Sequence, residues 1–374
     1  MKRVLVVTND FPPRAGGIQT FVYELVSRLD PEQVVVYCSR WKGWQEFDAK
    51  QPFPTVREET SVLLPTPSVR RRTQELMRDY GCTSVLFGAA APLGLLGPSL
   101  RRAGADRIVA LTHGHEAGWA QVPGARQMLR RIGDGVDTVT YLGEYTHKRI
   151  GAALSATAEG RMVELTPGVD TRIFRPDAGG EVVRERYELG RRPEILCVSR
   201  LMPRKGQDTL IRALPLVQEQ VPDAVLLLVG GGPYRKKLEK LANDSGAGSD
   251  IIFTGSVPWH ELPAHYAAGT VFAMPCRTRL RGLDVEGLGI VYLEAAATGL
   301  PVIAGDSGGA PDAVLPGVSG KVVSGASTPE LVRSLAAALN NCDGLTGTAG
   351  RRWVESDWSW SSRSLLLQEL LGLA

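Results

Sequence analysis

Short apolar runs rich in β-branched residues alternate with helical patterns along almost the whole chain. This alternation restricts the fold more than any other feature, because a parallel strand buried on both faces needs a crossover helix before its neighbour. Residues 18–29 form the first expected crossover helix. The pattern predicts an α/β protein built from doubly wound, Rossmann-like parallel sheets. We expect strands at residues 4–8, 34–38, 84–87, 107–111 and 138–141, and again at 195–199, 225–229, 251–254, 271–274 and 302–304.

The alternation stops near residues 166–170 and then restarts, which predicts two domains. A chain of 374 residues also exceeds the usual size of one hydrophobic core. We expect an N-terminal domain over residues 1–165 and a C-terminal domain over residues 166–359, with a short apolar helix at about 360–374 returning to the first. Ligands bind at the carboxyl ends of parallel strands, so two such domains facing each other would enclose a cleft there.

Composition favours a cytoplasmic protein. Hydrophobic residues make up 43% of the chain and charged residues 22%, as in soluble globular proteins. No run approaches the ~20 apolar residues of a membrane-spanning helix, and the apolar run at residues 4–7 is too short for a secretory signal. The five cysteines are scattered without a CxxC pair, which indicates free thiols in a reducing compartment and no metal site.

The net charge of +3 is distributed unevenly. Residues 1–165 hold 21 Lys and Arg against 17 Asp and Glu, whereas residues 166–374 hold 22 against 23. The excess includes three arginine clusters, at residues 70–72, 101–102 and 130–131. These are either solvated helix faces or a docking surface for anionic lipid head groups. Nucleic acid is not expected as a partner, because no aromatic residues are interleaved with the basic ones.

The loop after the first strand, residues 9–17, contains Asp10 and ends in Gly16-Gly17 before a helix. Two glycines at a helix N-terminus let backbone amides approach an anion, and the helix dipole favours negative charge. The loop is neither a GxGxxG dinucleotide fingerprint nor a P-loop. An anion site and a simple tight turn both remain open.

A second basic loop, residues 199–206, also follows an expected strand. Arg200 and Lys205 in this loop could both reach a diphosphate, the arginine through its planar fork and the lysine as a point charge. The alternative is an ordinary basic surface turn.

The segment 284–294 places glycines at the start of an apolar helix, so the amides of Gly287, Leu288, Gly289 and Ile290 are open to a phosphate. Glu286 lies at the mouth of this helix, and Glu294 lies ~12 Å further along it, at ~1.5 Å per residue. Glycosidase carboxylate pairs are only ~5–9.5 Å apart, so this spacing argues against hydrolase chemistry. It suits two anchors on one long ligand, although a paired buried carboxylate is the alternative for Glu294.

His113 follows the expected strand at residues 107–111, where it could bind a ligand hydroxyl or carry a proton. His113 and His115 form a possible metal pair, but no third ligand is apparent. The chain has no DxD sequence, so a metal bridging two phosphates is not expected.

Together these segments resemble the retaining nucleotide-sugar glycosyltransferases of GT-B fold, whose Glu-x7-Glu signature is matched by residues 286–294 and their sequel 295–304. A closer similarity is to the actinobacterial GDP-mannose-dependent mannosyltransferases that extend phosphatidylinositol monomannoside with an α-1,6-linked mannose. The segments that carry this similarity are residues 7–13, 87–93, 131–135, 273–279, 283–294 and 308–311. The chain departs from the pattern mostly between residues 40 and 80 and beyond 325.

The resemblance implies a role for each candidate residue. Gly16, Gly17, Arg200 and Lys205 would hold the donor diphosphate, Glu294 the ribose, Glu286 the mannose hydroxyls and His113 the distal sugar hydroxyl. Asp10 would face the acceptor and the reaction centre, and Val257 would lie along the base.

The activity implied is transfer of mannose from GDP-mannose to a phosphatidylinositol mannoside, with retention by a front-face displacement and without metal or cofactor. Fixed cations and amides at the departing phosphate would stabilise the transition state. A lipid acceptor implies peripheral attachment to the anionic inner face of the plasma membrane. A transferase using another nucleotide sugar or a soluble acceptor, and a non-catalytic binding or scaffold protein, are the alternatives. The sequence does not indicate an oligomeric state.

Overall fold

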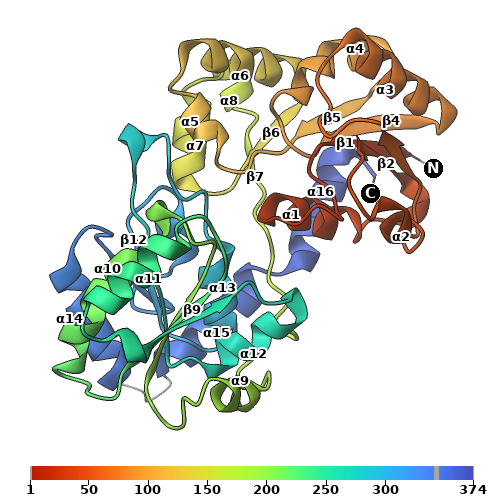
Figure 1. The fold of residues 1–374 in the computed structure, drawn as a ribbon. Helices are drawn as coiled ribbons and strands as arrows, with labels where there is room; N and C mark the ends of the chain where they lie inside the picture. The colour runs from red at the N-terminus through yellow and green to blue at the C-terminus, as the bar shows by residue number, and fades with distance from the viewer. Residues whose placement is uncertain (1, 341–344, 374) are drawn as a thin grey trace. The chain divides into compact units, whose positions relative to one another are not determined.

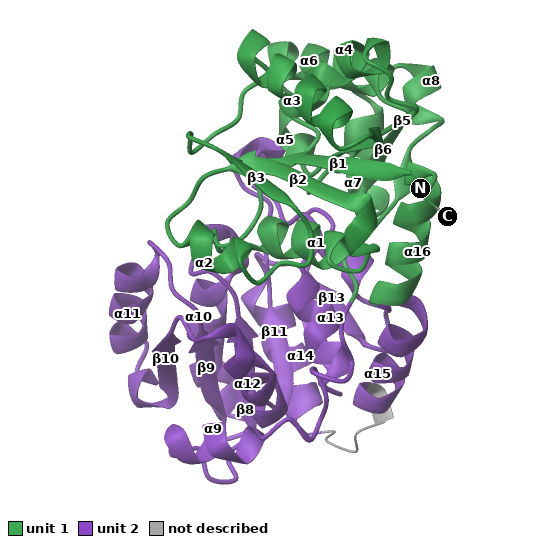
Figure 2. Ribbon diagram, turned by 90° about the vertical axis from the view of Figure 1, so that its right-hand side faces the viewer, with its two compact units in different colours: residues 1–168, 360–374 green, residues 169–359 purple. Residues whose placement is uncertain are grey.

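The computed structural model describes residues 2–340 and 345–373. The chain divides into two compact units, one of residues 1–168 and 360–374 and the other of residues 169–359 (Figure 2). The division after Gly168 lies slightly beyond the expected boundary at residues 165 and 166. We call the two parts unit 1 and unit 2.

Unit 1 is built on a seven-stranded sheet in the order β3-β2-β1-β4-β5-β6-β7, and every pair of neighbouring strands is parallel. The central strands consist mostly of apolar residues buried between two helical layers, which is why they show no polar alternation. The strands are β1 (Arg3–Thr8), β2 (Val34–Ser39), β3 (Thr55–Glu58), β4 (Cys82–Phe87), β5 (Arg107–Ala110), β6 (Thr138–Tyr141) and β7 (Val163–Glu164).

Helices cover both faces of this sheet. In Figure 1, α3, α4 and α6 lie on one face, and α1 lies with α16 on the other. The helices of unit 1 are α1 (Gly17–Val26), α2 (Trp44–Asp48), α3 (Pro67–Asp79), α4 (Gly97–Arg102), α5 (Glu116–Trp119), α6 (Pro123–Gly135), α7 (Glu144–Gly151), α8 (Ala156–Glu159) and α16 (Trp360–Leu371).

Unit 2 is built on a six-stranded sheet in the order β10-β9-β8-β11-β12-β13, again with parallel neighbours. Its strands are β8 (Glu194–Val198), β9 (Val225–Val229), β10 (Ile251–Gly255), β11 (Val271–Met274), β12 (Val302–Gly305) and β13 (Gly320–Val323). Its helices are α9 (Gly180–Arg186), α10 (Gln207–Gln218), α11 (Arg235–Asp244), α12 (Leu262–Ala268), α13 (Ile290–Ala297), α14 (Thr328–Asn340) and α15 (Leu345–Asp357).

Both sheets have the Rossmann strand order, so the predicted α/β class is confirmed. The order reverses between β1 and β4 in unit 1 and between β8 and β11 in unit 2, and ligands bind at such switch points. Three strands, β3, β7 and β13, were not predicted from the hydrophobic pattern. β3 includes Arg57 and Glu58, β7 has only two residues, and β13 contains Gly320 and Lys321, so none of them reads as a continuous apolar run.

The C-terminal helix α16 belongs to unit 1. The Trp360 ring packs 6.1 Å from the Phe21 ring of α1, and the Arg28 guanidinium lies 4.8 Å from its centroid. The Ser84 hydroxyl in β4 donates to the Leu371 carbonyl at 2.7 Å. These contacts attach the last helix to the first sheet.

None of the helices within the described ranges is both long and apolar enough to cross a bilayer. Cys38, Cys82, Cys197 and Cys276 are buried free thiols, and Cys342 lies outside the described residues.

Candidate active site

Three loops of unit 2 meet at the carboxyl ends of β8, β11 and β12. The loop after β8 packs against the loop after β11 at Gly206, where an added Cβ would lie 2.1 Å from the Pro275 carbonyl oxygen. The loop after β12 packs against the same region at Gly308, whose Cβ would lie 2.1 Å from the Glu286 carbonyl oxygen. Both glycines have positive φ, so backbone approach and conformation each exclude a side chain. Residues distant in sequence are thereby held at the switch point.

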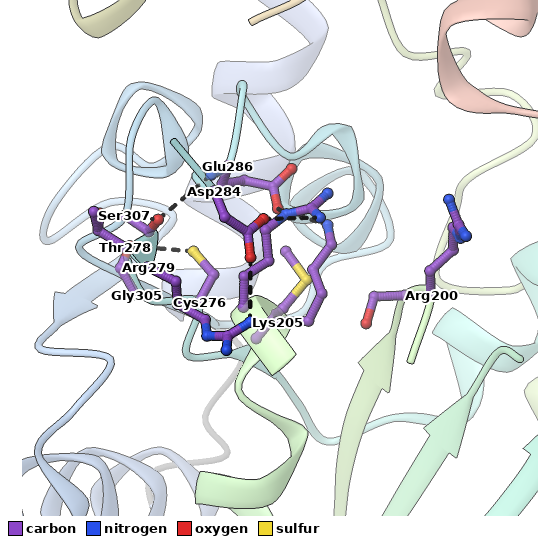
Figure 3. A network of polar contacts seen from close by, with 12 residues as sticks. Arg200, Lys205, Cys276, Thr278, Arg279, Asp284, Glu286, Gly305 and Ser307 are labelled. Atoms are coloured by element: carbon purple, nitrogen blue, oxygen red, sulfur yellow. Dashed lines mark hydrogen bonds and ion pairs between the residues drawn. The ribbon is translucent and has the colours of Figure 1, made fainter. Parts of the chain in front are cut away.

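Lys205 and Glu286 form an ion pair at this point (Figure 3). The Lys205 ammonium nitrogen lies 2.6 Å from Glu286 Oε2, and the two side chains are only 12% and 10% exposed. Arg204 Nε lies 3.8 Å from the same oxygen. Water and salt screen the attraction between two such shielded charges only weakly. An anionic ligand that binds Lys205 must therefore compete with Glu286 for it.

Further polar residues surround the pair. Asp284 contacts Arg204 at 3.5 Å and Arg279 at 3.3 Å. The Glu286 amide donates to the Ser307 hydroxyl at 3.4 Å. Neither Arg204 nor Ser307 was among the candidate residues predicted from the sequence. Arg204 could have been found as the neighbour of Lys205, whereas Ser307 follows another strand and reaches the site only through the fold.

Arg200 lies apart from this network. It follows β8 directly, is exposed, and points away from Lys205 and Glu286 in Figure 3. Within the described part of the chain, its guanidinium has no hydrogen bond or ion pair. The structure thus brings Lys205 to Glu286 and leaves Arg200 free, and a shared grip of Arg200 and Lys205 on one diphosphate stays a prediction.

Helix α13 begins at Ile290, and Glu286 lies in the loop that leads into it. Gly289 is the N-cap residue of α13 and has a φ of 85°. Because no side chain accepts a hydrogen bond at this position, the first backbone amides of α13 have no capping partner. Leu288 is only 4% exposed. A ligand would therefore contact Leu288, like Gly287, through the backbone.

Glu294 lies in α13 and faces α12, away from the partners of Glu286. The Tyr266 hydroxyl donates to Glu294 Oε2 at 2.7 Å. Burial raises the pKa of Glu294 to about 7, and the Tyr266 hydrogen bond opposes that shift. The two glutamates therefore make contacts with different parts of unit 2. Val257 follows β10, at the same edge of the sheet as these loops, and is partly buried.

In unit 1, Asp10 follows β1 at the switch point of the first sheet. Its Oδ1 accepts from Gln19 Nε2 at 2.5 Å and lies 3.6 Å from Arg14. Gly16 caps α1 without a side-chain hydrogen bond, and an added Cβ would lie 2.1 Å from Gln19 Oε1. Gly17 opens the helix and is exposed. The loop thus presents the uncapped N-terminus of α1 beside one carboxylate.

His113 lies after β5 and is fixed from two sides. Its Nε2 lies 2.6 Å from the Gly88 carbonyl oxygen, which requires the proton on Nε2, and the Glu116 carboxylate accepts from its amide at 3.0 Å. Burial lowers the pKa of His113, while nearby Glu116 and Asp10 oppose that shift. The imidazole therefore presents Nδ1 as an acceptor.

His113 and His115 stack with their ring centroids 6.4 Å apart. Across residues 2–340 and 345–373, no group of three or more His, Cys, Asp or Glu side chains has an arrangement suited to holding a metal ion.

The class of protein follows from these features and from the similarity of the chain to known proteins. The family model "Glycosyl transferases group 1" matches residues 181–346, which include Lys205, Glu286 and Glu294. The structure of Anabaena Alr3699/HepE in complex with UDP superposes with a TM-score of 0.83 at 17% identity, covering 100% of both chains. That likeness shows the fold, and the predicted GT-B fold is confirmed.

Curated relatives define the family more narrowly. The chain is 50% identical to the GDP-mannose-dependent α-(1-6)-phosphatidylinositol monomannoside mannosyltransferase of Mycolicibacterium smegmatis, covering 98% of each chain. It is 43% identical to the corresponding enzyme of Corynebacterium glutamicum, named for a monoacylated acceptor, covering 99% of this chain and 98% of the relative. The chain belongs to this family of mannosyltransferases and is an enzyme of the glycosyltransferase class.

Proposed function

We propose that this enzyme transfers mannose from GDP-mannose to a phosphatidylinositol mannoside and forms an α-1,6 linkage with retention of configuration. The observation that carries the proposal is the 2.6 Å Lys205–Glu286 pair at the switch point of unit 2. A cation of the kind that binds a diphosphate lies there beside a carboxylate of the kind that binds sugar hydroxyls, and this supports the proposal. The names of relatives 43–50% identical to the chain supply the donor and the acceptor.

On this proposal, binding of the donor separates the ion pair. The diphosphate binds Lys205, the free Arg200 and the backbone amides of residues 287–290. Glu286 then accepts hydrogen bonds from mannose hydroxyls. Glu294 accepts from the ribose, and Val257 lies along the base. Each exchange replaces an interaction within the protein by a charge-assisted one with the donor, so buried charges do not stay unpaired.

The residues of unit 1 serve the sugar and the acceptor. His113 accepts a hydrogen bond from the distal mannose hydroxyl through Nδ1, and Asp10 faces the acceptor and the reaction centre. The amides of Gly16 and Gly17 approach the donor diphosphate at the uncapped end of α1.

The mechanism that we propose is a front-face displacement. The bond between the mannose anomeric carbon and the phosphate oxygen breaks while a bond to the acceptor oxygen forms on the same face. The proton of the acceptor hydroxyl passes to the departing phosphate, so no enzymic nucleophile, metal or cofactor takes part. Fixed donors at the developing phosphate charge contribute typically ~3–4 kcal/mol each.

The test is a transfer assay with radiolabelled GDP-mannose and phosphatidylinositol monomannoside in the presence of EDTA. We expect a more highly mannosylated lipid, cleaved by an α-1,6-specific mannosidase. Transfer from a UDP-sugar but not from GDP-mannose would overturn the donor assignment. A mannosyl adduct trapped on any side chain would overturn the front-face mechanism.

We also propose that unit 1 binds the anionic membrane surface. The arginine clusters at residues 70–72, 101–102 and 130–131 lie on α3, α4 and α6, which cover one face of the sheet (Figure 1). Arg71 is 78% exposed, whereas Arg101 is bound to Asp137 and to two backbone carbonyls. Arg71 and its neighbours on α3 are thus more available to lipid phosphates than Arg101.

A further inference from the structure

A surface hollow of about 660 Å³ lies in unit 1 and is lined by residues to which no role has yet been given. Its walls come from the segments that follow β2 and β3, at the same sheet edge as the Asp10 loop. Ligand sites on parallel sheets lie at this edge, and the volume suits a small molecule. Its principal lining residues are Arg40, Trp41, Lys42, Trp44, Glu59 and Thr60.

Two cations line the hollow against one carboxylate. Arg40 contacts Glu59 at 2.6 Å, and its guanidinium lies 5.1 Å from the centroid of the Trp44 ring. Lys42 is exposed and has no hydrogen bond or ion pair with any other described residue. A third cation, Arg14, lies over the Trp41 ring at 4.8 Å. The tryptophans therefore hold guanidinium groups in place, and the local charge favours an anion.

The hollow also has unused groups for hydroxyls. In the described portion of the chain, the side chains of Gln45 and Ser61 are exposed and make no internal hydrogen bond. The chain then continues from Ser61 into Val62 and Leu64, which are 49% and 51% exposed. Cations, hydroxyl-binding groups and exposed aliphatic side chains thus follow one another along one surface. A phosphorylated polyol that carries acyl chains has this same order of chemistry.

Buried hydrogen bonds hold the hollow rigidly to the Asp10 loop. Arg57 is 1% exposed at its side chain, bonds both oxygens of Asp48 in α2, and donates to the carbonyls of Ser39 and Pro12. On the other wall, the Asn9 side-chain amide donates to the Leu63 carbonyl at 2.9 Å and accepts from the Leu63 backbone N–H at 2.5 Å. Such preorganisation reduces the entropy that a bound ligand must lose.

Arg14 connects the hollow to Asp10, because it contacts Asp10 at 3.6 Å as well as the Trp41 ring. We infer that this hollow is the acceptor subsite of the enzyme and binds the phosphorylated polyol head group of the lipid acceptor. Lys42 and Arg40 bind the phosphate, and Gln45 and Ser61 bind polyol hydroxyls. The inference rests on the proposed function, which leaves the place of the acceptor's phosphate open.

The experiment compares Lys42→Gln and Trp44→Ala with the wild-type enzyme in the transfer assay, with the KM of each substrate measured separately. Lys42 is exposed, so its substitution does not disturb the fold. We expect Lys42→Gln to raise the KM for phosphatidylinositol monomannoside about five- to tenfold, because one charge-assisted contact is lost. The KM for GDP-mannose and the melting temperature should stay unchanged.

The matched control is Lys50→Gln, which removes the same charge just beyond α2, where Lys50 is 69% exposed and pairs with Glu46 outside the hollow. It should leave both KM values unchanged. If the wild-type enzyme transfers mannose and Lys42→Gln keeps the acceptor KM, the subsite is refuted while the proposed function stands. If the wild-type enzyme transfers no mannose, the proposed function itself has failed.

Two soluble probes separate a head-group site from a general anion site. The deacylated acceptor, a glycerophosphoinositol mannoside, should inhibit competitively with lipid acceptor and lose inhibition in Lys42→Gln and in Trp44→Ala. Inorganic phosphate should inhibit much more weakly. Equal inhibition by phosphate and by the deacylated acceptor would overturn the assignment to a polyol.

Discussion

The Tyr266 hydroxyl donates a hydrogen bond to Glu294 Oε2 at 2.7 Å. Through this bond α12 holds the second glutamate of the Glu-x7-Glu segment. Tyr266 is fully buried, and burial raises its pKa well above the ordinary value. The hydroxyl therefore stays protonated and remains a donor to Glu294 at every pH of interest. The ionisation of the glutamate alone decides the charge of this pair.

The first prediction concerns the pH dependence that follows from Glu294. Its pKa is about 7 in the folded protein, against 4.5 for an ordinary glutamate. The stabilisation from this group is present below pH 4.5 and is lost as the pH rises through 7. Glu294→Gln should therefore stabilise the protein relative to wild type at pH 8 by about 1–3 kcal/mol and much less at pH 5.

Chemical denaturation of both proteins at pH 5 and pH 8 measures this difference. Glu194, a fully buried glutamate whose pKa burial also raises to about 7, is present in both proteins and cancels in the comparison. The same variant should bind GDP more weakly, because a neutral amide is a poorer acceptor for ribose hydroxyls. An equal stability difference at both pH values would show that Glu294 keeps an ordinary pKa.

A second prediction concerns Lys205. Among the described cations, Lys205→Gln leaves the shielded Glu286 with the 3.8 Å contact to Arg204 alone, so both the donor site and its charge balance are disturbed. We expect kcat to fall by about 10²–10³, the range for removal of one fixed donor to developing charge. Calorimetric titration with GDP should show weaker binding. Lys240→Gln, which removes an exposed lysine paired with Asp244, is the control and should change neither quantity.

A third prediction separates the two nitrogens of His113. His113→Gln can retain a donor to the Gly88 carbonyl but has no acceptor in the place of Nδ1. We expect kcat/KM for the donor to fall about 10–100-fold with little change in melting temperature, since one transition-state hydrogen bond is lost. His260→Gln, at an exposed position of unit 2, serves as the comparison. Full activity of His113→Gln would show that His113 has no role in the reaction.

The fourth prediction concerns the membrane. Neutralising Arg70, Arg71 and Arg72 together should weaken binding to acidic vesicles about tenfold or more, since each surface cation contributes ~1 kcal/mol. Sedimentation with phosphatidylglycerol vesicles at 50 and 300 mM salt measures both the affinity and its salt dependence. The chain offers a control of the same charge in Arg235, Lys236 and Lys237 of α11. Binding that ignores salt, or that the control variant weakens equally, would contradict a docking face on α3.

Local patterns were sufficient for much of the fold. The buried strands β1, β2, β8 and β9 are continuous apolar runs, so their positions follow from the hydrophobic pattern. The strands β3 and β13 contain charged residues or glycine and pair at the outer parts of their sheets, where burial is incomplete. Periodicity carries no signal for such strands, because their pairing depends on neighbours that are distant in sequence.

The candidate site shows the same division at the level of single residues. Lys205 and Glu286 could each be singled out from the loop that contains it. Their direct ion pair could not, since it depends on Gly206 and Gly308 letting three loops approach at one edge of the sheet. The exact start of α13 likewise depends on backbone conformation. Gly289 adopts a left-handed conformation and delays α13 until Ile290.

Local stretches of sequence were enough to predict the α/β class, most of the strands, the glycosyltransferase family and the loops that carry the candidate residues, because each of these depends on residues close together in the chain. Which of those residues meet depends on the three-dimensional fold. It paired Lys205 with Glu286, left Arg200 free, set Glu294 against Tyr266, and placed Arg14 between Asp10 and the tryptophan-lined hollow. Contacts of this kind depend on strand order and on close backbone packing, which no local stretch of sequence encodes.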